Sequence, residues 1–600
     1  MPVSTLSGIV SGASVSVTLL GSTSSVLAWA ETAQHPSLRN ALGFTDYLDG
    51  WGKGDHYFHE TDADGASLIG PAEEHRSIYV TGNPTTNWSA ADIAAEEGIP
   101  QSAVTGAWLE SQTKYGSQAF PLDRSRAANL LARIAPRPSA GSIHVLLERG
   151  HDYGGTSWFR RGASGHSPLH PFVVRDWGTG PKPVVGDQSA FQTPVRNMVL
   201  MNLATSAGGN KFYGLTNLLM EGVVFDQHEV EAQGNTSPTF YRCGLLNAIR
   251  SQPAQGSATW SDENANRSSG IFADETTGLL MLENYGYHCG WVDGYDTVSH
   301  RWENGTYGQP PNLYSHNFYL QGTNKDTTFA DNVSLEPASS HVQFRSGGYY
   351  WGNVLVNGNI AGNMSGGDAV SGAVIGEGNY TFAADSLAMS AAFLIAGAGA
   401  AGPYTSGAAN WGWDAGGTGR IGTFEEMLLA HDQGPNNPAE IAFKNTFAPI
   451  GETIRLFGNE YRDTSIVYNW ATNEGPANAN RNVDGLDTAV LNDTTVQRYA
   501  ETVQGLSTTT LRGFSEHVIA QPAPWEAGRA FLNWTRTRFG LAPVDSSRTA
   551  NQTVVFSPWP HAEGFRWDNR RNWSTGYFPI DGDRVELASH DVRSPVHTLR

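Results

Sequence analysis

A short phrase recurs in the middle of this chain: a polar residue or glycine, then Asn, then alternating apolar positions. Four copies and one earlier relative share it, at His316–Leu320, Asp331–Leu335, Gly352–Val356, Gly378–Phe382 and Glu283–Tyr287. Asn332 and Asn353 lie 21 positions apart. Short strands that recur at such an interval between Gly, Asn and Ser turns are typical of a parallel β-solenoid, in which successive turns of chain stack to bury their apolar faces. The sequence therefore predicts a mainly β fold with a long, rigid face suited to an extended polymer.

Composition and charge narrow the class of protein. Charged residues make up 16% of the 600 positions, Gly occurs 68 times, and aromatic residues reach 11%. These values favour a turn-rich β protein with local helices over a disordered chain. The net charge of −20 argues against nucleic acid as a partner, because phosphate binding depends on Lys and Arg. An acidic glycan would likewise need a local basic groove or a bound cation.

Cysteine content, hydropathy and the first residues bear on the compartment. Cys243 and Cys289 are the two cysteines, and either one bridge or two buried thiols would fit them. No window approaches the long apolar run of a membrane helix, so we expect no membrane insertion. Met1–Ala30 contains no Lys or Arg, so we expect no secretory signal, and Val15–Leu20 is predicted as an exposed edge strand. Export would then use a route without a leader, or release within a virus particle.

Hydrophobic periodicity predicts a series of strands with a few helices. Helical patterns lie at Ser89–Glu97, Arg124–Ile134, Thr423–His431 and Glu526–Phe539. Strand patterns lie at Ile143–Gly150, Pro171–Val185, Met198–Leu203, Leu218–Phe225, Phe240–Leu246, Ile271–Ala273 and Leu279–Tyr287.

One run of the sequence resembles a known family. It consists of the capping helix, the strand that ends in Arg149-Gly150, and the Gly-x-Gly turn within Pro171–Val185. This run resembles the opening turns of right-handed parallel β-helix proteins of the pectate-lyase-like superfamily. The resemblance implies a single-chain right-handed parallel β-helix over roughly residues 143–382. The Gly-x-Gly is no dinucleotide fingerprint, because Pro181 and Pro183 prevent the helix that should follow it.

These patterns divide the chain into four regions. Residues 1–115 are expected to form an N-terminal attachment or capping region, and residues 116–385 the parallel β-helix. Residues 386–545 are predicted as a mixed accessory region or a continuation of the solenoid. In residues 546–600, the run Trp567–Leu587 resembles the opening of a second, small β-solenoid module of surface and secreted bacterial proteins.

Side chains able to bind a glycan or move a proton gather within the repeated phrases. They are Tyr314, His316, Tyr319, Lys325, His341, Gln343 and Arg345. Because side chains alternate along a strand, Val342 and Phe344 are predicted to fill the core. His341, Gln343 and Arg345 then share the outer face, where they suit the hydroxyl groups and carboxylates of a polysaccharide.

A lyase is the first chemistry that this group favours. Some alginate- and chondroitin-cleaving lyases of the superfamily use a Lys and an Arg about one turn of chain apart, often with calcium. Lys325 and Arg345 lie 20 positions apart, and Val342–Gly348 resembles the Arg-bearing strand of those enzymes. The resemblance implies Lys325 as the base and Arg345 as the donor to the leaving oxygen. In a lytic reaction on these residues, His341 is the alternative base, and Arg345 and His316 hold the carboxylate and stabilise the enolate-like charge.

The remaining members of the group are assigned to substrate binding. Tyr314, Tyr319 and Gln343 are the predicted substrate-binding residues. The sequence departs from the lyases on either side of Lys325, where Asn324 stands for an acidic calcium ligand and Asp326 for a Ser. Lys325 as a solvated turn residue, and Arg345 as a structural or ligand-binding one, therefore stay as alternatives.

Hydrolysis by a pair of carboxylates is the second chemistry. The candidates are Asp226, Glu221, Glu283 and Asp293, although the adjacent Asp-Asp pair of β-helix polygalacturonases is missing from the chain. No metal site is specified, because His56 and His59 lack a third ligand in the sequence. Calcium therefore enters only through the lyase resemblance.

These observations predict a protein that binds and cleaves an extracellular or cell-surface polysaccharide, with a lyase favoured over a hydrolase. The resemblance implies a phage tailspike, commonly a homotrimer, or a secreted depolymerase, located on a virion surface or outside the cell. The alternative is a binder without activity, such as an adhesin or a structural virion spike.

Overall fold

The computed structural model describes part of the chain, and every structural statement below concerns that part. The described residues are 4–10, 13–19, 75–135, 142–155, 158, 163–167, 170–191, 195–206, 208–248, 268–291, 295–296, 301–302, 315–325, 327–338, 340–344, 348–356, 374–377, 380–382, 423–425, 428–431, 447–448, 453–456, 459–462, 465–469, 499–506, 509, 511–538, 553–556 and 584–587. The chain divides into two compact units, of which one is Pro71–Val544 and the other combines Met1–Gly70 with Asp545–Arg600.

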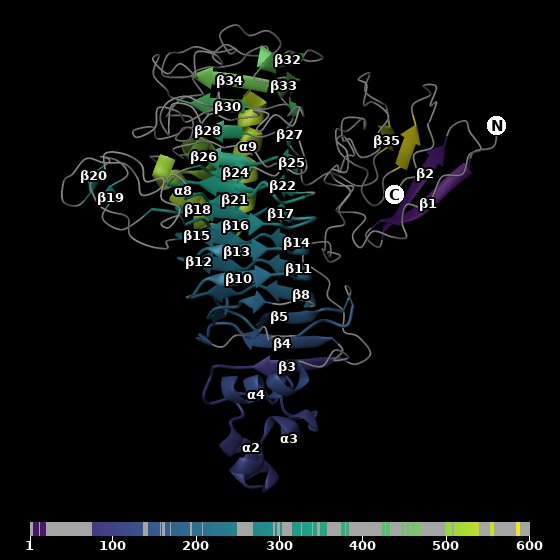
Figure 1. Ribbon diagram of the computed structural model, residues 1–600, viewed down its shortest axis with the longest axis vertical. Helices are drawn as coiled ribbons and strands as arrows, with labels where there is room; N and C mark the ends of the chain where they lie inside the picture. The colour runs from purple at the N-terminus through teal and green to yellow at the C-terminus, as the bar shows by residue number, and fades with distance from the viewer. Residues whose placement is uncertain are drawn as a thin grey trace. The chain divides into compact units, whose positions relative to one another are not determined.

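The larger unit is mainly β, and most of its strands belong to three sheets, which are parallel except for one antiparallel pair at an end of each of the two larger sheets (Figure 1). In spatial order, the 13-stranded sheet contains β3 (Arg76–Val80), β4 (Ile143–Glu148), β5 (Phe172–Trp177), β8 (Arg196–Met201), β11 (Thr216–Glu221), β14 (Thr236–Tyr241), β17 (Leu280–Leu282), β22 (Thr328–Ala330), β25 (Gly348–Trp351), β27 (Val374–Glu377), β29 (Thr423–Glu425), β33 (Asn459–Arg462) and β32 (Thr453–Leu456). The 11-stranded sheet contains β31 (Phe447–Ala448), β34 (Ser465–Asn469), β30 (Leu428–His431), β28 (Tyr380–Phe382), β26 (Val354–Val356), β23 (Val333–Leu335), β18 (Tyr285–Tyr287), β15 (Gly244–Leu246), β12 (Val224–Asp226), β9 (Ala204–Thr205) and β6 (Val184–Val185). The six-stranded sheet contains β24 (Val342–Phe344), β21 (Phe318–Leu320), β16 (Ile271–Asp274), β13 (Val230–Gln233), β10 (Asn210–Tyr213) and β7 (Ala190–Phe191).

The three sheets are built level by level, a level being one strand from each sheet in chain order. Five consecutive levels are β10–β11–β12, β13–β14–β15, β16–β17–β18, β21–β22–β23 and β24–β25–β26. Each strand pairs in parallel with its counterpart on the next level, so Phe212 is the partner of Ala232, and Ala232 of Ala273. The side chains of these three residues are fully buried in one shared hydrophobic core. The core is therefore continuous from level to level, as the repeated phrase predicts.

On six successive levels, from β8–β9 to β25–β26, two residues join the 13-stranded sheet to the 11-stranded sheet, and the first of the two forms a sharp corner. The corner residues all have positive φ, and they are Asn202 (54°), Gly222 (60°), Arg242 (54°), Glu283 (53°), Asp331 (53°) and Gly352 (66°). The left-handed conformation turns the chain within a single residue, at some cost for residues other than glycine.

The Asn that follows this corner explains most copies of the repeated phrase. Asn284, Asn332 and Asn353 are fully buried at this position on three successive levels. The side-chain oxygen of Asn332 accepts hydrogen bonds from the backbone N–H and the amide of Asn284, both at 2.9 Å. Asn353 accepts the same two bonds from Asn332, at 2.9 and 3.1 Å. This asparagine ladder satisfies buried backbone groups that the sharp corner would leave unpaired.

The copy of the phrase at His316–Leu320 lies in a different sheet from the others. Asn317 precedes β21 in the six-stranded sheet, where its oxygen accepts from the N–H of Cys289 at 3.2 Å and its amide donates to the hydroxyl of Ser334 at 2.8 Å. The five-residue phrase thus marks two kinds of corner. Asn379, in the last copy, lies outside the described residues.

Three α-helices lie at the β3 end of the strands (Figure 1). They are α2 (Ala90–Glu97), α3 (Gly106–Glu110) and α4 (Arg124–Ile134), with a short 3₁₀ turn at Gln101–Ala103. Ser89 and Asp123 cap the first turns of α2 and α4 through their side chains. The apolar face of α4 packs into the core beside β3 through Ala127, Leu130 and Leu131. These helices therefore close one end of the core.

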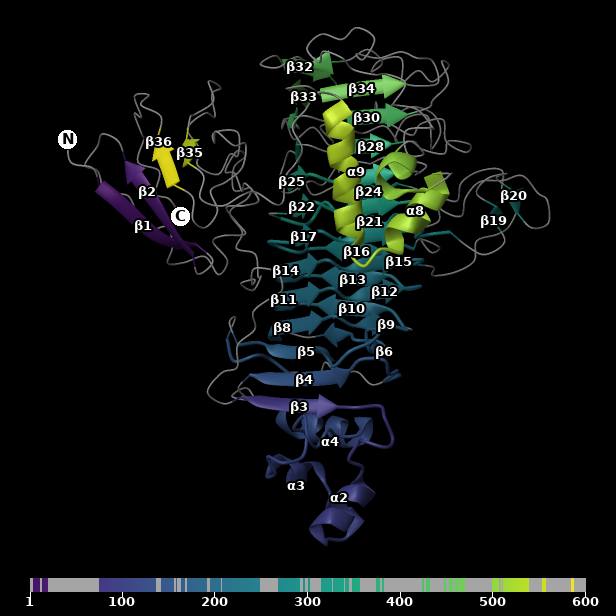
Figure 2. The same ribbon diagram turned by 180° about the vertical axis from the view of Figure 1, so that it is seen from behind.

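Two further helices stand beside the 11-stranded sheet (Figure 2). They are α8 (Leu511–Ile519) and α9 (Pro524–Arg538), and a π-helix precedes them at Ala500–Gln504. They share a small core of their own, formed by Tyr499, Phe514, Val518 and Phe531, each at most 1% exposed.

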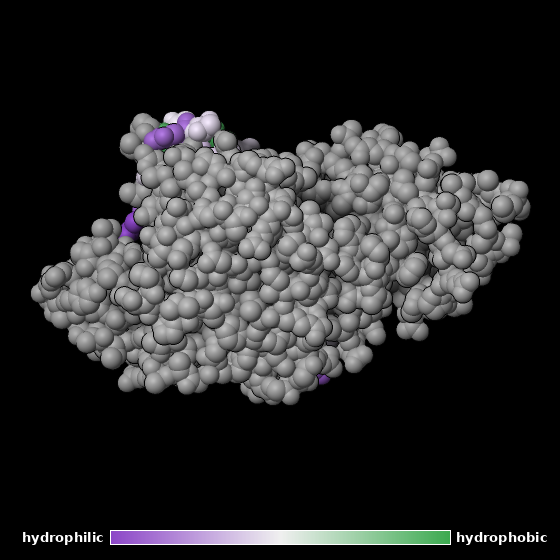
Figure 3. All heavy atoms as spheres, turned by 90° about the horizontal axis from the view of Figure 1, so that it is seen from above, coloured by the Kyte–Doolittle hydropathy of each residue, from purple (hydrophilic) through white to green (hydrophobic). Residues whose placement is uncertain are grey.

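The few described residues visible from the upper end of the molecule are mostly hydrophilic (Figure 3).

The smaller unit contains one four-stranded sheet among its described residues. Its order is β1 (Ser4–Val10), β2 (Ala13–Leu19), β36 (Arg584–Leu587) and β35 (Thr553–Phe556). The prediction that Val15–Leu20 forms an edge strand is therefore wrong in part. A strand does form there, but β2 pairs with β1 on one side and with β36 on the other. The partner comes from the far end of the sequence, where no local pattern reveals it.

Two other sequence expectations are settled by the fold. The predicted helix at Thr423–His431 is wrong, because β29 and β30 form there and pair with strands of neighbouring levels. A nine-residue run holds both periodicities, and the pairing decides between them. Cys243 and Cys289 are free, buried thiols rather than a bridge. The helices expected near Ser89–Glu97, Arg124–Ile134 and Glu526–Phe539 are confirmed.

The described helices also bear on membrane association. None of them has both the length and the apolar character that crossing a bilayer would require.

Candidate functional site

The outer face of the six-stranded sheet carries aligned polar and aromatic side chains. On β13, Val230 and Ala232 belong to the core, so the alternating Glu231 and Gln233 point outward. The same alternation holds on the neighbouring strands. We call the outward side chains of this sheet the site face, and they are Lys211, Tyr213, Glu231, Gln233, Phe272, Asp274, Tyr319 and Gln343.

The site face has two columns of side chains in register. One column runs through Lys211, Glu231, Phe272, Tyr319 and Gln343. Except for Lys211, its members are 4–9% exposed. The other column contains Tyr213, Gln233 and Asp274, which are half-buried. The second column is thus the more accessible to a ligand.

Glu231 is the charged centre of the first column. Its Oε1 lies 3.2 Å from Nζ of Lys211 on the next strand, and its Oε2 accepts a hydrogen bond from the hydroxyl of Tyr213. Two different residues of β10 therefore hold one carboxylate of β13 in a fixed orientation. A carboxylate with a phenol as its neighbour has a proton donor within reach.

Asp274 provides a second carboxylate on the adjacent strand. Its Oδ1 accepts hydrogen bonds from the hydroxyl of Thr323 and, at 3.0 Å, from the N–H of Glu275. Glu231 pairs with Phe272, two positions before Asp274. A strand spacing of about 4.8 Å and a two-residue rise of about 6.6 Å put the Cα atoms of Glu231 and Asp274 roughly 8 Å apart. Paired carboxyl groups in glycoside hydrolysis lie about 5 to 9.5 Å apart, and side chains on Cα atoms this close can reach such a separation.

Aromatic rings and an amide lie farther along the same face. The ring of Tyr319 makes edge contacts with Phe272, at 5.1 Å between centroids, and with His316, at 5.2 Å. Gln343 is the register partner of Tyr319, and its side-chain oxygen is buried without a hydrogen-bond partner in the described part of the chain. Nδ1 of His316 lies 2.5 Å from the hydroxyl of Ser340. Three of the predicted residues, His316, Tyr319 and Gln343, are therefore brought together.

His341 lies apart from this face. Its side chain is fully buried, and its Nδ1 lies 2.9 Å from the hydroxyl of Ser334 in the 11-stranded sheet. Burial lowers the pKa of His341 to about 3, so the ring is neutral at ordinary pH. The expected alternation fails because His341 precedes β24 and lies in the corner before it. Val342 and Phe344 do belong to the core, as predicted.

The predicted lyase pair is only half described. Lys325 is exposed, and its backbone makes a bridge to Thr277. Arg345 and Tyr314 lie outside the described residues. The side chain of Asn324, next to Lys325, accepts from the N–H of Thr276 at 2.9 Å and donates to the carbonyl of Ala273 at 3.0 Å. Both hydrogen bonds hold the side chain of Asn324 in the interior, so it cannot replace the acidic calcium ligand of the lyases.

Metal ligands do not gather elsewhere in the described ranges. Across them, no group of three or more His, Cys, Asp or Glu side chains is arranged to hold a metal ion. No step proposed below depends on a calcium ion.

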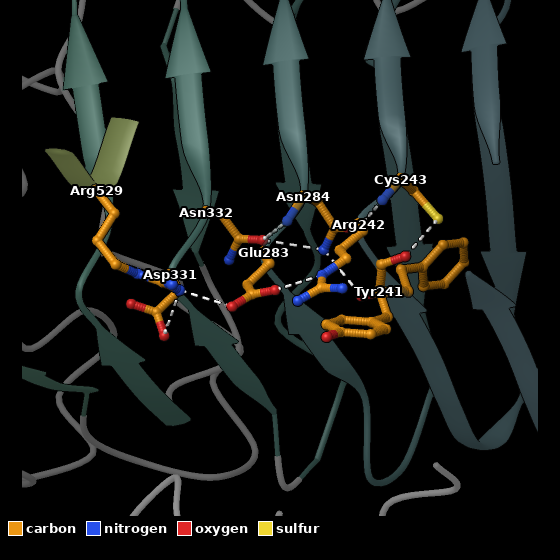
Figure 4. Close-up of polar contacts among 9 residues, drawn as sticks. Tyr241, Arg242, Cys243, Glu283, Asn284, Asp331, Asn332 and Arg529 are labelled. Carbon is orange, nitrogen blue, oxygen red and sulfur yellow. Dashed lines mark hydrogen bonds and ion pairs between the residues drawn. The ribbon is translucent and has the colours of Figure 1, made fainter. Parts of the chain in front are cut away.

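The three described carboxylates that the sequence singled out make separate contacts. Asp226 accepts from the amide of Asn247 at 2.9 Å, Glu221 points outward on the 13-stranded sheet, and Asp293 lies outside the described residues. Glu283 lies at a corner, between Arg242 and Arg529 (Figure 4). Burial would raise the pKa of Glu283, but the charges of Arg529 and Arg242 outweigh burial and hold that pKa below its usual value.

Glu231 and Asp274 were not among the residues that the sequence singled out. Each stands beside alanine and valine or isoleucine positions, in Val230–Gln233 and Ile271–Asp274. An acidic residue alternating with small and branched apolar residues is the signal that could have indicated them.

Comparison of the chain with known protein families, curated proteins and solved structures finds no match.

Proposed function

We propose that this chain is a right-handed parallel β-helix that binds an extracellular polysaccharide across the site face and hydrolyses it, with Glu231 and Asp274 as the reacting carboxylates. The observation that carries the proposal is the presence of these two carboxylates on neighbouring parallel strands of one face.

The levels and corners support the β-helix. The chain visits the six-, 13- and 11-stranded sheets in the same order on five successive levels, and one-residue left-handed corners recur at the same place. Internal asparagine ladders are a natural consequence of stacking such corners. A stack of this kind presents side chains at a spacing of about 4.8 Å per level, which suits an extended chain of sugars.

The side chains of the site face support a sugar ligand. Of the more accessible column, Tyr213 offers an aromatic ring and Gln233 an amide donor and acceptor for hydroxyl groups. Aromatic rings pack against the apolar C–H faces of sugars, and an amide suits hydroxyls, which both donate and accept. The nearly buried Phe272, Tyr319 and Gln343 lie behind this column in register and support it.

The charge of the same face favours hydrolysis over β-elimination. Its described charged groups are Lys211, Glu231 and Asp274, and the one cation is already paired with Glu231. A uronate in this place would meet a net negative charge, whereas a neutral sugar would not. In the hydrolysis we propose, one carboxyl group protonates the leaving oxygen and the other carboxylate activates water or attacks the sugar.

The lyase remains a second candidate, supported by one specific feature. Lys325 is an exposed cation that follows β21, on the level that carries Tyr319. If Lys325 acts with Arg345, the substrate is a uronate, and cleavage creates a double bond that absorbs ultraviolet light. The two reactions thus differ in substrate and in product.

The decisive experiment measures polymer length and absorbance together. Purified protein is incubated with neutral and uronate-containing polysaccharides, and the products are sized by chromatography. Hydrolysis predicts shorter chains with new reducing ends and no new absorbance. Shorter chains with new absorbance would replace the hydrolase by the lyase, and binding without shortening would support a glycan-binding adhesin or virion spike.

Two conservative variants test the residues themselves. Glu231→Gln and Asp274→Asn should each lower the turnover rate about a thousand-fold or more while leaving binding within a few-fold. Glu275→Gln, an exposed neighbour of Asp274, is the matched control and should retain full activity. Full activity in both site variants would remove this pair from the proposal.

The place of action follows from the proposal rather than from the fold. A polysaccharide long enough to cross several levels is found on cell surfaces and outside cells, so we propose an extracellular or virion-surface protein. A homotrimer, as in tailspikes, is part of the same proposal, and the mass of the protein in solution tests it.

A further inference from the structure

We infer that helix α9 is a brace that locks four consecutive levels of strands together and fixes their spacing. The inference stands on contacts between α9 and the 11-stranded sheet, and it does not depend on a glycan ligand.

The geometry of α9 suits this role. Its 15 residues give a length of about 22 Å, which equals four to five strand spacings of about 4.8 Å. Figure 2 shows the helix standing across the strands of the 11-stranded sheet rather than along one of them. α9 contacts β23 and β26, while α8 contacts β18. The helix thus reaches successive levels instead of extending one.

One guanidinium group connects two levels. Nη2 of Arg529 lies 2.6 Å from Oε1 of Glu283 and 3.6 Å from Oδ2 of Asp331, which are corner residues of adjacent levels (Figure 4). Arg242, the corner residue of the level before, donates to Oε2 of Glu283 at 2.7 Å. The three corners and the helix therefore form one chain of alternating charges.

The charges in this chain are largely shielded from water. The side chains of Arg529, Glu283 and Asp331 are 13%, 12% and 10% exposed. Burial would lower the pKa of Arg529, but Asp331 and Glu283 outweigh it and raise that pKa. Removing one member of such a network leaves a partner charge buried without compensation, which is strongly destabilising.

Close packing supplements the ion pairs. Gly528 lies directly against β23, since a Cβ added to it would collide with Cγ2 of Val333. Trp525 stacks near Arg242, at 5.1 Å from the guanidinium carbon, and its ring lies 6.2 Å from that of Tyr285. Contacts with three corners and two strands distinguish a brace from a helix that covers a single strand.

The braced levels are those that carry the site face. Arg242, Glu283 and Asp331 lie on the levels of β13, β16 and β21, which hold Glu231, Asp274 and Tyr319. The levels that carry Glu231 and Asp274 are thus tied together at their corners as well as by the pairing of β13 with β16. If the proposed hydrolysis is correct, α9 positions its carboxylates without touching the substrate.

Hydrogen exchange measured on the whole chain tests the brace. Arg529→Met should speed amide exchange at least ten-fold in β18, β23 and β26, and leave β3, β4 and β5 unchanged. Arg133→Met is the matched control, because Arg133 forms an exposed ion pair with Glu110 at 3.2 Å and should change neither region. Unchanged exchange in β18 to β26, or an equal rise across all sheets, would overturn the inference.

Gly528→Ala provides an independent test that also covers failure of the first variant to fold. Alanine favours a helix by about 1 kcal/mol over glycine, so a free helix would gain stability. A brace would lose it, because the added methyl group collides with Val333. Faster exchange in β23 and β26 supports the brace, and slower or equal exchange overturns it, whether or not any polysaccharide is cleaved.

Discussion

Two regions of the molecule put carboxylates beside cations, and they do so in opposite ways. At the corner under α9, Glu283 has a guanidinium group on each oxygen, at 2.6 and 2.7 Å. On the site face, Glu231 has one ammonium group and one phenol as neighbours. Asp274 there is half-buried and accepts from uncharged donors.

The difference separates a structural network from a candidate reactive one. A carboxylate with a guanidinium group on each oxygen keeps its negative charge, because both neighbours favour the ionised form. A half-buried carboxylate with neutral donors can still accept or release a proton. The density of charge alone therefore does not identify a site, and the identity of each neighbour does.

The largest expected effect on stability comes from Glu283. Glu283→Gln leaves Arg242 and Arg529 close together without their shared anion, so we expect a loss of about 3 to 5 kcal/mol. Glu231→Gln is the matched change on the site face, where the remaining ammonium group of Lys211 is 39% exposed and stays hydrated, so it should cost only about 1 to 2 kcal/mol. Urea unfolding followed by circular dichroism measures both. Equal midpoints for the two variants would erase the contrast between the regions.

A second contrast lies inside one level, between a satisfied and an unsatisfied polar group. Asn332 exchanges hydrogen bonds with Asn284 and Asn353 and also donates to the carbonyl of Met281 at 3.0 Å. Asn332→Ala leaves several of these buried groups unpaired, so it should cost about 2 to 3 kcal/mol. The buried hydroxyl of Thr328 has no hydrogen-bond partner among the described groups.

Thr328→Val is therefore the matched opposite. It replaces an unsatisfied hydroxyl by a methyl group of the same shape and should be neutral or stabilise by up to about 1 kcal/mol. The same urea titration reads both variants. A destabilising Thr328→Val, or a neutral Asn332→Ala, would show that the ladder does not hold the corners.

As the pH falls, the buried histidines should lower the stability of the folded protein before the ion pairs do. Burial lowers the pKa of His341 to about 3, and burial together with the charge of Arg512 lowers that of His288 to about 4. The unfolded chain binds these protons near pH 6.5, so the stability held by neutral histidines is complete above that pH and is lost as the pH falls. The loss can reach about 1.4 kcal/mol per pH unit for each histidine.

The contribution of Glu283 to stability is lost in a lower pH range. Its pKa is below the usual value of 4.5, so its contribution is complete above that value and disappears only at more acid pH. Unfolding midpoints measured between pH 7 and pH 3 should first decline below pH 6.5. His341→Asn should reduce that first decline and leave the later one unchanged. A stability that is constant from pH 7 to pH 4.5 would contradict the burial of both histidines.

The sequence predicted strands and corners because each asparagine phrase is local. A corner residue, the ladder Asn and an apolar strand lie within five positions, as in Asp331–Leu335, so a single turn of chain carries its own signature. The placement of His341 could not be predicted in this way. Alternation orients side chains within a strand, and His341 lies just before one.

Glu231 and Asp274, the pair on the site face, could not be predicted from the sequence for a different reason. Glu231 and its register partner on the next level, Phe272, are 41 positions apart, whereas Lys211 and its register partner Glu231 are 20 apart. Residues 249–267 lengthen that one turn of chain and break the period. Neighbours across a parallel sheet depend on register, which a single sequence with an irregular period does not reveal.

The smallest expected effect concerns Lys325, which was a leading catalytic candidate from the sequence. It is exposed, beyond the end of β21, so Lys325→Ala should leave the urea midpoint unchanged. If hydrolysis by Glu231 and Asp274 is correct, polysaccharide cleavage should also stay within about two-fold of the parent. A hundred-fold loss of cleavage in Lys325→Ala, with full activity in Glu231→Gln, would transfer the reaction from the carboxylates to the lysine. The region that the sequence favoured would then be the reactive one, and the site face would only bind the polymer.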